Sequence, residues 1–332
     1  MRIREAFIAV TYRCNSKCSM CNIWKLDPGA EMTPADYHKI PPSLKTINIT
    51  GGEPFLRHDL VEVIREIHSI VPSSRIVFST NGFLTARITS TIKEIMHFHP
   101  RVGVGVSIDG IGKTHDTIRG IEGAYDKALT TVTALKNLGI RDLRIAMTIM
   151  RENSKEVRDV FALARGLDVE FTCVHVHNSD VYFCKDDNPT ETSSGISDSN
   201  SIASVVEAQL HSKHAKDWLR AYHTNGIIDV GERHRYTSSC EAGKEYVFIA
   251  PNGDVYPCNV MNKKLGNITQ HRSWDEFAAN IDEYDLRKAV TNCNMDCWMV
   301  CNTRSLIKAH PFRVGSWILK RRFFPPSESK PL

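Results

Sequence analysis

The chain has 332 residues, of which 42% are hydrophobic and 24% are charged, an ordinary composition for a folded protein of about two domains. This composition excludes disordered, collagen-like and coiled-coil proteins. No run approaches the roughly 18–20 apolar residues that cross a bilayer, and the apolar run at 6–10 is too short for a signal peptide, so we expect a cytoplasmic protein. The net charge is +4, and segment 308–332 alone has six basic residues against one glutamate. Because the rest of the chain is close to neutral, we expect no nucleic-acid partner.

Short β-rich runs alternate with helical segments as far as residue 177, which is the pattern of repeated βα units around a parallel sheet. Six units of this kind close only part of a barrel. We therefore predict an α/β fold that begins with a partial (β/α)6 TIM-like barrel. Its strands are expected near 6–12, 45–50, 75–80, 102–108, 143–150 and 169–177, and its helices near 60–70, 86–98, 124–138 and 155–165.

The alternation of side chains along a strand predicts which residues face the barrel lumen. In 102–109 the branched residues occupy one face, which suits packing against helices, and small or polar residues occupy the other, which suits a bound ligand. The same alternation is applied to the last two strands. The residues assigned in this way to the inner face are Gly103, Gly105, Ser107, Asp109, Arg144, Ala146, Thr148, Cys173, His175 and His177.

After the barrel, residues 178–201 are rich in Asp, Asn, Ser and Thr and lack apolar periodicity, which indicates a long loop. One helix is expected from about 202 to 222, and a hairpin over 246–256 that turns at Asn252-Gly253. We divide the chain into a barrel (1–178), a linker and helix (179–236), a small second domain (237–307) and a basic tail (308–332). The tail is interpreted as a helix laid against the barrel; a peripheral membrane contact is the less favoured interpretation.

Ten cysteines are the most informative feature, because in a reducing compartment they are more typical of ligands or reactive thiols than of disulfides. Cys14, Cys18 and Cys21 directly follow the first strand, so their thiolates share one tight loop at the carboxyl end of the sheet. Three cysteines on a cubane of four irons leave one iron open, which suits a substrate-like cofactor. Zinc, which binds cysteine at similar spacings, is the alternative.

This loop, with Met20 before its last cysteine and Gly51-Gly52-Glu53-Pro54 ending the second strand, resembles the radical S-adenosylmethionine (radical SAM) superfamily over roughly residues 5–180. The resemblance implies a [4Fe-4S] cluster whose open iron chelates the amino and carboxylate groups of SAM. It also implies that the GGEP segment holds the SAM ammonium through backbone oxygens. Further cofactor contacts are implied for Met20 near the adenine, for Arg144 at the SAM carboxylate, and for Ser79, Asn81, Ser107 and Asp109 at strand ends.

A second group of five cysteines comes from two segments near the end of the chain. The run Gly253-Asp-Val-Tyr-Pro-Cys258 resembles the G-x4-C element of SPASM and twitch domains, over about 240–305. A full SPASM domain has seven cysteines, so the resemblance implies a twitch-like domain with one auxiliary [4Fe-4S] cluster. Which four cysteines bind it stays open, and a structural zinc site is the alternative. The five are Cys240, Cys258, Cys293, Cys297 and Cys301.

The resemblance also implies a reaction. One electron from a donor such as flavodoxin or ferredoxin splits SAM, and the resulting 5′-deoxyadenosyl radical removes a hydrogen atom from the substrate. We expect oxidation or epimerisation of a small hydroxylated molecule such as a sugar or cyclitol. Cys173 is a candidate hydrogen donor for epimerisation, and His175 and His177 are candidate bases; an ordinary structural role is the alternative for each.

Two other functions stay open. Peptide maturation by thioether or crosslink formation is the alternative within the same enzyme class. It is less favoured because the first strand begins within about six residues of Met1, which leaves no room for a leader-binding module. The alternative from another class is a non-catalytic adaptor in which both cysteine groups hold zinc.

Overall fold

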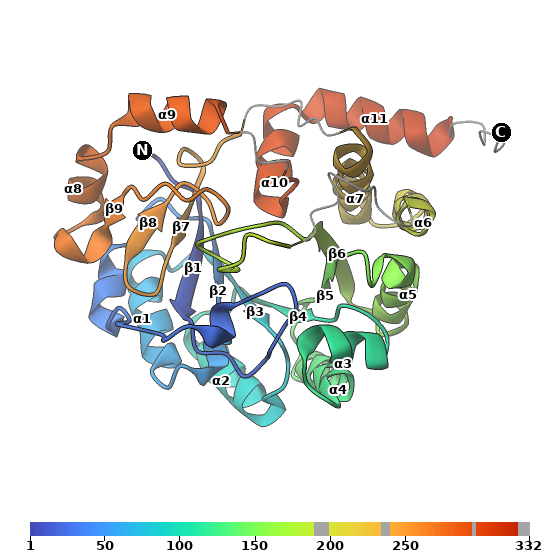
Figure 1. The fold of residues 1–332 in the computed structure, drawn as a ribbon, viewed down its shortest axis with the longest axis horizontal. Helices are drawn as coiled ribbons and strands as arrows, with labels where there is room; N and C mark the ends of the chain where they lie inside the picture. Colours follow the sequence, from blue (N-terminus) through green and yellow to red (C-terminus); the bar gives the residue numbers. More distant parts are fainter. Residues whose placement is uncertain (189–198, 234–239, 294–296, 325–332) are drawn as a thin grey trace.

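The computed structural model describes residues 1–188, 199–233, 240–293 and 297–324 (Figure 1). Within these residues one sheet of nine strands has the order β6-β5-β4-β3-β2-β1-β7-β8-β9. The pairs from β1 to β6 are all parallel, which confirms the predicted partial barrel. The strands are β1 (Glu5–Thr11), β2 (Thr46–Gly51), β3 (Arg75–Thr80), β4 (Val102–Ser107), β5 (Asp142–Ile149), β6 (Glu170–His175), β7 (Tyr246–Ile249), β8 (Asp254–Tyr256) and β9 (Gly266–Asn267).

Helices follow the barrel strands and cover the outer face of the sheet (Figure 1). The helices of the barrel are α1 (Leu60–Ile70), α2 (Thr85–Phe98), α3 (Lys113–Arg119), α4 (Ala124–Asn137) and α5 (Val157–Gly166). The later helices are α6 (Ser199–Leu210), α7 (Ala215–Arg233), α8 (Trp274–Ala279), α9 (Glu283–Thr291), α10 (Val300–Ala309) and α11 (Pro311–Phe323).

An apolar row runs across the outer face of the barrel strands and forms the centre of the core. The register aligns one residue from each of five adjacent strands. All five side chains are buried. Each contributes about 1.5–3 kcal/mol through removal of its apolar surface from water. The row is Ile8, Ile49, Phe78, Val104 and Leu143.

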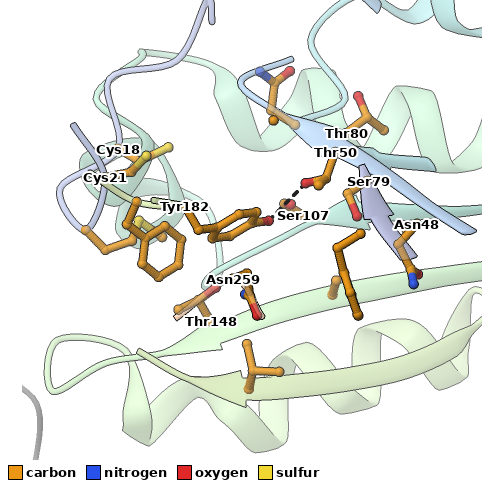
Figure 2. Close-up of a pocket in the computed structure, with 18 of the residues that line it drawn as sticks. Cys18, Cys21, Asn48, Thr50, Ser79, Thr80, Ser107, Thr148, Tyr182 and Asn259 are labelled. Atoms are coloured by element: carbon orange, nitrogen blue, oxygen red, sulfur yellow. Dashed lines mark hydrogen bonds between the residues drawn. The ribbon is translucent and has the colours of Figure 1, made fainter. Parts of the chain in front are cut away.

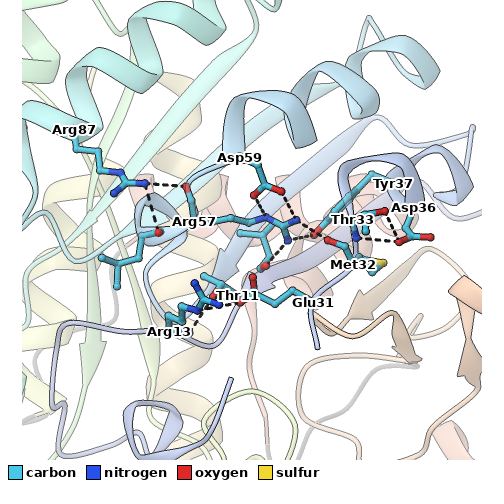
Figure 3. A network of polar contacts seen from close by, with 12 residues as sticks. Thr11, Arg13, Glu31, Met32, Thr33, Asp36, Tyr37, Arg57, Asp59 and Arg87 are labelled. Atoms are coloured by element: carbon cyan, nitrogen blue, oxygen red, sulfur yellow. Dashed lines mark hydrogen bonds and ion pairs between the residues drawn. The ribbon is translucent and has the colours of Figure 1, made fainter. Parts of the chain in front are cut away.

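A buried arginine fixes the segment that follows the cysteine loop against β1 (Figure 3). Arg57 donates through Nη1 to the carbonyl oxygen of Val10, at 2.8 Å, and through Nη2 to that of Met32, at 2.6 Å. Its Nε lies 2.6 Å from Asp59, the residue before α1. This network ties the carboxyl end of β1 to the start of α1, and it thereby shapes the edge of the barrel from which the cysteine loop leaves.

Two segments differ from the sequence expectations. The single helix expected over 202–222 is two helices, because Ser212 ends the first: its hydroxyl accepts from the backbone N–H of His214 and donates to Asp217 of α7. The first part of the expected linker packs closely on the barrel. There the Tyr12 hydroxyl donates to the carbonyl oxygen of Val181, and Asn188 donates to that of Met20. Residues 189–198 of this segment lie outside the described residues.

The hairpin expected over 246–256 is confirmed, with β7 and β8 antiparallel and Gly253 at φ 87° in the turn. β7 also pairs with β1 in parallel, so the carboxyl-terminal part of the chain extends the sheet of the barrel. The hairpin between Cys240 and Cys258 is therefore hydrogen-bonded to the first barrel strand.

The basic tail forms α11, which packs against α7 and α6 through Val314, Trp317 and Ile318. The opposite side of the helix leaves Phe312 and Phe323 exposed. Of the described helices, none combines the length and the apolar character needed to span a bilayer.

Two helix glycines provide a matched test of packing. Alanine in place of a helix-interior glycine ordinarily stabilises a protein by about 1 kcal/mol. At Gly315 in α11 a Cβ meets no atom within 4 Å, so Gly315→Ala is expected to show this gain. At Gly226 in α7 a Cβ would collide with the indole ring of Trp298, so Gly226→Ala is expected to destabilise by roughly 1–3 kcal/mol. Urea unfolding of both variants tests this; a gain at Gly226 would contradict the packing of Trp298 on α7.

Candidate active site in the barrel lumen

The first three cysteines open into one cavity of about 260 Å³ inside the barrel (Figure 2). Gly51, Gly52, Ser79, Asn81 and Ser107 line the same cavity, as expected for residues at the carboxyl ends of parallel strands. Burial raises the pKa values of the Cys14 and Cys21 thiols to about 12. The cysteine loop is thus placed where a ligand in the lumen would meet all three sulfur atoms.

Backbone and side-chain hydrogen bonds hold the cysteine loop in place. The N–H groups of Lys17 and Ser19 donate to the carbonyl oxygens of Arg119 and Ile118, both at 2.9 Å. Asn81 donates to the side-chain oxygen of Asn15 at 2.7 Å. Asn81 therefore joins the end of β3 to the loop as well as lining the cavity.

Arg119, which the sequence analysis did not single out, connects the cysteine loop to Asp109, just after β4. Its Nη2 pairs with the fully buried Asp109 at 2.6 Å, and its Nη1 donates to the sulfur of Cys18 at 3.6 Å. Asp109 also accepts from the backbone N–H of Thr148, and it is not among the residues that line the cavity. The expected cofactor contact of Asp109 is thus replaced in this structure by an ion pair that positions Arg119.

The GGEP segment is fitted against the cysteine loop by its two glycines. Gly51 has φ 126°, and a Cβ there would collide with the carbonyl oxygen of Thr11. A Cβ at Gly52 would collide with the carbonyl oxygen of Arg13. Both glycines line the cavity, whereas Pro54 is buried at the start of a short helical turn. Glycine is required here because the two backbones lie in direct contact.

Glu53 is completely buried and points toward the end of β3. Its carboxylate accepts from the Thr80 hydroxyl at 2.9 Å and from the backbone N–H of Asn81 at 2.8 Å. It also accepts from the N–H of Phe55 at 3.3 Å. Burial raises the pKa of Glu53 to about 7. Glu53 therefore acts in this structure as the link between the GGEP turn and β3.

The raised pKa of Glu53 predicts a pH dependence of stability. Between its ordinary value of 4.5 and about 7 the folded chain holds a proton that the unfolded chain has lost. The contribution of Glu53 is therefore fully present below pH 4.5 and is lost as the pH rises through 7. Between pH 4.5 and 8 the SAM-free wild-type protein is expected to lose about 3 kcal/mol more unfolding free energy than Glu53→Gln. Urea unfolding at both pH values measures this, and equal losses would contradict a buried, protonated Glu53.

Met20 and Arg144 also line the cavity but make different contacts from those expected. Met20 is buried and packs against Ile118, Met150 and Val176. Arg144 is the third residue of β5, so it lies in the amino-terminal half of the barrel, whereas the cysteine loop leaves the carboxyl end of β1. Its Nη2 pairs with Asp142 at 2.7 Å.

The predicted inner face of β6 was wrong by one residue. The register pairs Ala146 with Thr172 and Thr148 with Val174, which places Thr172 and Val174 in the lumen. Cys173 pairs with Met147, is buried in the apolar core, and interacts with the side chain of Thr224 on α7. Burial raises the pKa of the Cys173 thiol to about 12. Cys173 is still among the residues that line the cavity, and its thiol interacts with a side chain of α7, so its role as a hydrogen donor stays a prediction.

The two candidate bases, His175 and His177, have different surroundings, because β6 ends between them. His175 pairs with Ile149 on the helix-facing side, does not line the cavity, and has its Nδ1 2.8 Å from the carbonyl oxygen of Val176. His177 follows the strand, lines the cavity and contacts Phe183 with ring centroids 4.7 Å apart. Burial lowers the pKa of His177 to about 4, so its imidazole is neutral at physiological pH.

The segment 179–188, the first part of the expected linker, supplies further cavity residues. The hydroxyl of Tyr182 lies 3.0 Å from that of Thr50, directly before the GGEP glycines (Figure 2). Phe183 lines the cavity, and its carbonyl oxygen accepts from the N–H of Asn22 in the cysteine loop region. No local motif marks these residues, because they reach the lumen only through the fold of a polar loop.

The second cysteine group converges beside β7. Burial raises the pKa of Tyr246, and the next largest causes are the nearby charges of Cys301, Cys240 and Cys258. The sulfur of Cys258 accepts from the backbone N–H groups of Val260 and Met261, at 3.4 and 3.2 Å. The remaining two, Cys293 and Cys297, interact electrostatically with Cys258 and Cys301 respectively. All five expected cysteines thus lie in one region.

The donor set fits iron–sulfur clusters at both places. Thiolate sulfur is the ligand of such clusters, and the first three cysteines line one end of a cavity with room for a further ligand. In the described part of the chain, no three cysteine, histidine or carboxylate side chains lie close enough together to hold a single metal ion. Cys301 of the second group lines the same cavity as Cys14, Cys18 and Cys21, so one lumen connects the two cysteine groups.

Comparison with known protein families agrees with this geometry. Residues 8–164 match the model of the radical SAM superfamily, and residues 240–298 match that of an iron-sulfur cluster-binding domain, SPASM. The chain belongs to the radical SAM superfamily and carries a SPASM auxiliary cluster domain. Its cofactors are SAM, the [4Fe-4S] cluster that binds SAM, and auxiliary iron–sulfur clusters.

Individual relatives are more distant. The chain is 27% identical over 270 residues to the mycofactocin maturase MftC of Mycolicibacterium smegmatis, which covers 75% of this chain and 62% of MftC. It is 33% identical over 172 residues to the pre-heme d1 synthase of Dinoroseobacter shibae, covering 48% and 40% of the two chains. It is 26% identical over 285 residues to an AdoMet-dependent heme synthase of Methanosarcina barkeri, covering 79% and 78%. The chain thus spans less than two thirds of the first two relatives.

Solved structures share the fold at low sequence identity. Streptococcus suis SuiB bound to its precursor peptide SuiA has a TM-score of 0.63 and 16% identity, over 88% of this chain and 68% of SuiB. The enzyme anSMEcpe with bound AdoMet and the Cp18Cys peptide has a TM-score of 0.60 and 15% identity, over 95% of this chain and 99% of that chain.

Proposed function

We propose that this protein is a radical SAM enzyme that oxidises a peptide substrate held in the lumen between its two cysteine groups. The observation that carries the proposal is the shared cavity, which Cys14, Cys18 and Cys21 line at one end and Cys301 lines from α10. Relatives support a peptide over the sugar or cyclitol first expected: AlbA of Bacillus subtilis is named for subtilosin bacteriocin biosynthesis, and SuiB and anSMEcpe have been solved with peptides. We also propose the functional division into a barrel over 1–178 and an auxiliary domain over 237–307.

The residues of this chain are proposed to bind, orient and shield the reactants. Backbone atoms at Gly51 and Gly52 would hold the SAM ammonium, Ser79, Asn81 and Ser107 would contact the cofactor, and Tyr182 would close the lumen beside Thr50. When bound, the cluster and SAM supply a radical that removes hydrogen from a substrate carbon, and the auxiliary cluster supplies an electron acceptor. The neutral imidazole of His177 is available as an acceptor for a substrate proton.

The proposal is tested with anaerobically reconstituted protein, SAM and reduced flavodoxin as electron donor. Three probes are compared: a library of short synthetic peptides, coproporphyrin, and an aminocyclitol. We expect 5′-deoxyadenosine to form in step with a peptide product that lacks two hydrogen atoms. Turnover of coproporphyrin or of the aminocyclitol without any peptide product would overturn the peptide assignment, and zinc binding without SAM cleavage would overturn the enzyme itself.

A further inference from the structure

Two positively charged side chains line the part of the lumen that lies away from the cysteine loop. Asn48 lies at the opposite end of the cavity from Cys18 and Cys21 (Figure 2). Three arginines line the cavity, and no aspartate or glutamate lines it among the described residues. Arg119 lies beside the cysteine loop and is paired with the buried Asp109, whereas Arg144 and Arg304 lie away from that loop. A cavity wall with guanidinium groups and no carboxylate favours an anionic ligand.

Arg144 belongs to one of two neighbouring groups of ion pairs that together have an excess of positive charge. Asp142 is shared by Arg75, at 2.5 Å, and Arg144, at 2.7 Å. In the next strand Glu170 is shared by Lys216 and Arg220 of α7. Asp217 in turn joins Arg220 to Arg165. The two groups together contain five cations and three carboxylates: Arg75, Arg144, Arg165, Lys216 and Arg220 with Asp142, Glu170 and Asp217.

Arg144 also has an unused donor. Its side chain is only 13% exposed, and its Nε has no hydrogen-bond partner among the described residues. A buried N–H group without a partner costs roughly 1–3 kcal/mol, and more when the group is charged. Burial and the nearby positive charge of Arg75 also lower the pKa of Arg144, partly offset by Asp142. An anion bound in the cavity beside Arg144 would reduce the excess of positive charge around this side chain.

Arg304 brings a second guanidinium to this part of the cavity. It follows Cys301 by three residues, about one turn of α10, and pairs with Glu5, the first residue of β1. Glu5 also accepts from the side chain of Asn48 at 2.9 Å. Arg304 is held by Glu5 and still lines the cavity, with its side chain 29% exposed. It is therefore accessible to a ligand that reaches the auxiliary cysteines.

We propose that the amino-terminal half of the lumen is a carboxylate-binding site, with Arg144 as the principal anchor and Arg304 as a second contact for a carboxylate of the peptide substrate. This inference rests on the proposed function and adds the chemistry by which the substrate is recognised. The planar guanidinium suits a carboxylate because two of its N–H groups can donate to both oxygens at once. A carboxylate fixed at this depth leaves the rest of the substrate extending toward the cysteine loop.

Binding of a minimal probe tests the site without knowledge of the full substrate. Holoenzyme with SAM, without reductant, is titrated with 4-fluorobenzoate and with 4-fluorobenzamide, and ¹⁹F NMR reports binding. We expect the acid to bind at least tenfold more tightly than the amide. Arg144→Gln is expected to weaken acid binding at least tenfold, and Arg144→Lys less, because lysine keeps the charge and loses the planar donor pair. The matched control is Arg313→Gln on the exposed side of α11, which is expected to bind as the wild type does.

Several outcomes overturn the inference. These are equal binding of acid and amide, no binding of the acid, or unchanged acid binding in Arg144→Gln. Iron content and circular dichroism of Arg144→Gln show whether the variant folds; if it does not, Arg304→Gln is used, with a loss of at least threefold expected and no loss contradicting the site. SAM cleavage by wild-type protein is measured separately, so failure of the carboxylate site is distinguishable from failure of the proposed function.

Competition against 4-fluorobenzoate distinguishes two sources of a peptide carboxylate. N-acetylglycine presents a main-chain terminal carboxylate, and the α-amide of N-acetylglutamate presents a side-chain carboxylate. Displacement by the first supports recognition of a peptide terminus, and displacement by the second supports recognition of an acidic side chain. If neither displaces the probe, the site does not recognise peptide carboxylates.

Discussion

Replacing Cys14, Cys18 or Cys21 with alanine is expected to abolish 5′-deoxyadenosine formation and to remove about four irons per chain from the reconstituted protein. The physical reason is that the three sulfurs line one cavity and together supply the protein ligands of a single cluster. With only two of the three thiolates left, a cluster would have two irons without a protein ligand and would be bound too weakly to be retained. Iron and sulfide analysis and chromatographic detection of 5′-deoxyadenosine measure the two effects.

Cys184 is the matched control for this experiment. It lies in the segment that packs on the cysteine loop, near enough to Cys21 to affect the pKa of that thiol, and it belongs to neither cysteine group. Cys184→Ala is expected to retain the full iron content and SAM cleavage. Equal iron content and activity in Cys18→Ala and wild type would contradict the assignment of the loop.

The second large effect is expected on the free energy of unfolding when the positive charge of Arg119 is removed. Arg119→Gln leaves the fully buried carboxylate of Asp109 without its ionic partner, and breaking one partner of a buried pair costs about 3–5 kcal/mol. Urea unfolding of the cluster-free protein measures the loss. The double variant Asp109→Asn with Arg119→Gln is expected to lose clearly less than the sum of the two single variants, because no charge is then left unpaired.

An exposed ion pair, Arg65 with Glu94, is the control for the buried pair of Arg119 with Asp109. Arg65 and Glu94 lie 3.1 Å apart with side chains 53% and 55% exposed, so Arg65→Gln is expected to cost at most about 1 kcal/mol. A loss of similar size in Arg119→Gln and Arg65→Gln would show that the Asp109 pair carries no special weight in the fold.

Local sequence patterns were sufficient to predict the part of the site formed by short segments. The three cysteines and the two glycines of GGEP are close in sequence to strand ends, and the parallel sheet brings those ends to one edge. The apolar and polar faces of β4 follow from simple alternation within one strand. These features depend on few residues and on geometry that every parallel barrel shares.

The inner face of β6 could not be predicted in the same way. Which of Thr172 and Cys173 faces the lumen depends on the register with β5, and a shift of one residue reverses every side chain. Both alternating sets in this strand contain polar and apolar residues, so composition does not choose between them. His177 reaches the cavity although His175 does not, because the chain leaves the strand after residue 175.

Arg119 and Tyr182 show a second limit of sequence reasoning. Each reaches the site through contacts with residues about a hundred or more positions away: Arg119 with Cys18, and Tyr182 with Thr50. Neither has a local motif that distinguishes it from an ordinary helix or loop residue. Their roles follow only from the tertiary fold, in which a buried ion pair and a packed loop complete the cavity.

The central claim is that the amino-terminal cysteines hold a cluster with one iron free to bind SAM. Electron paramagnetic resonance of the reduced cluster, recorded with and without SAM on protein whose metal content is known, tests this most directly. The account predicts about eight irons per chain and a spectrum of the first cluster that changes when SAM is added. Stoichiometric zinc in place of iron, or a cluster spectrum unchanged by saturating SAM, would contradict it.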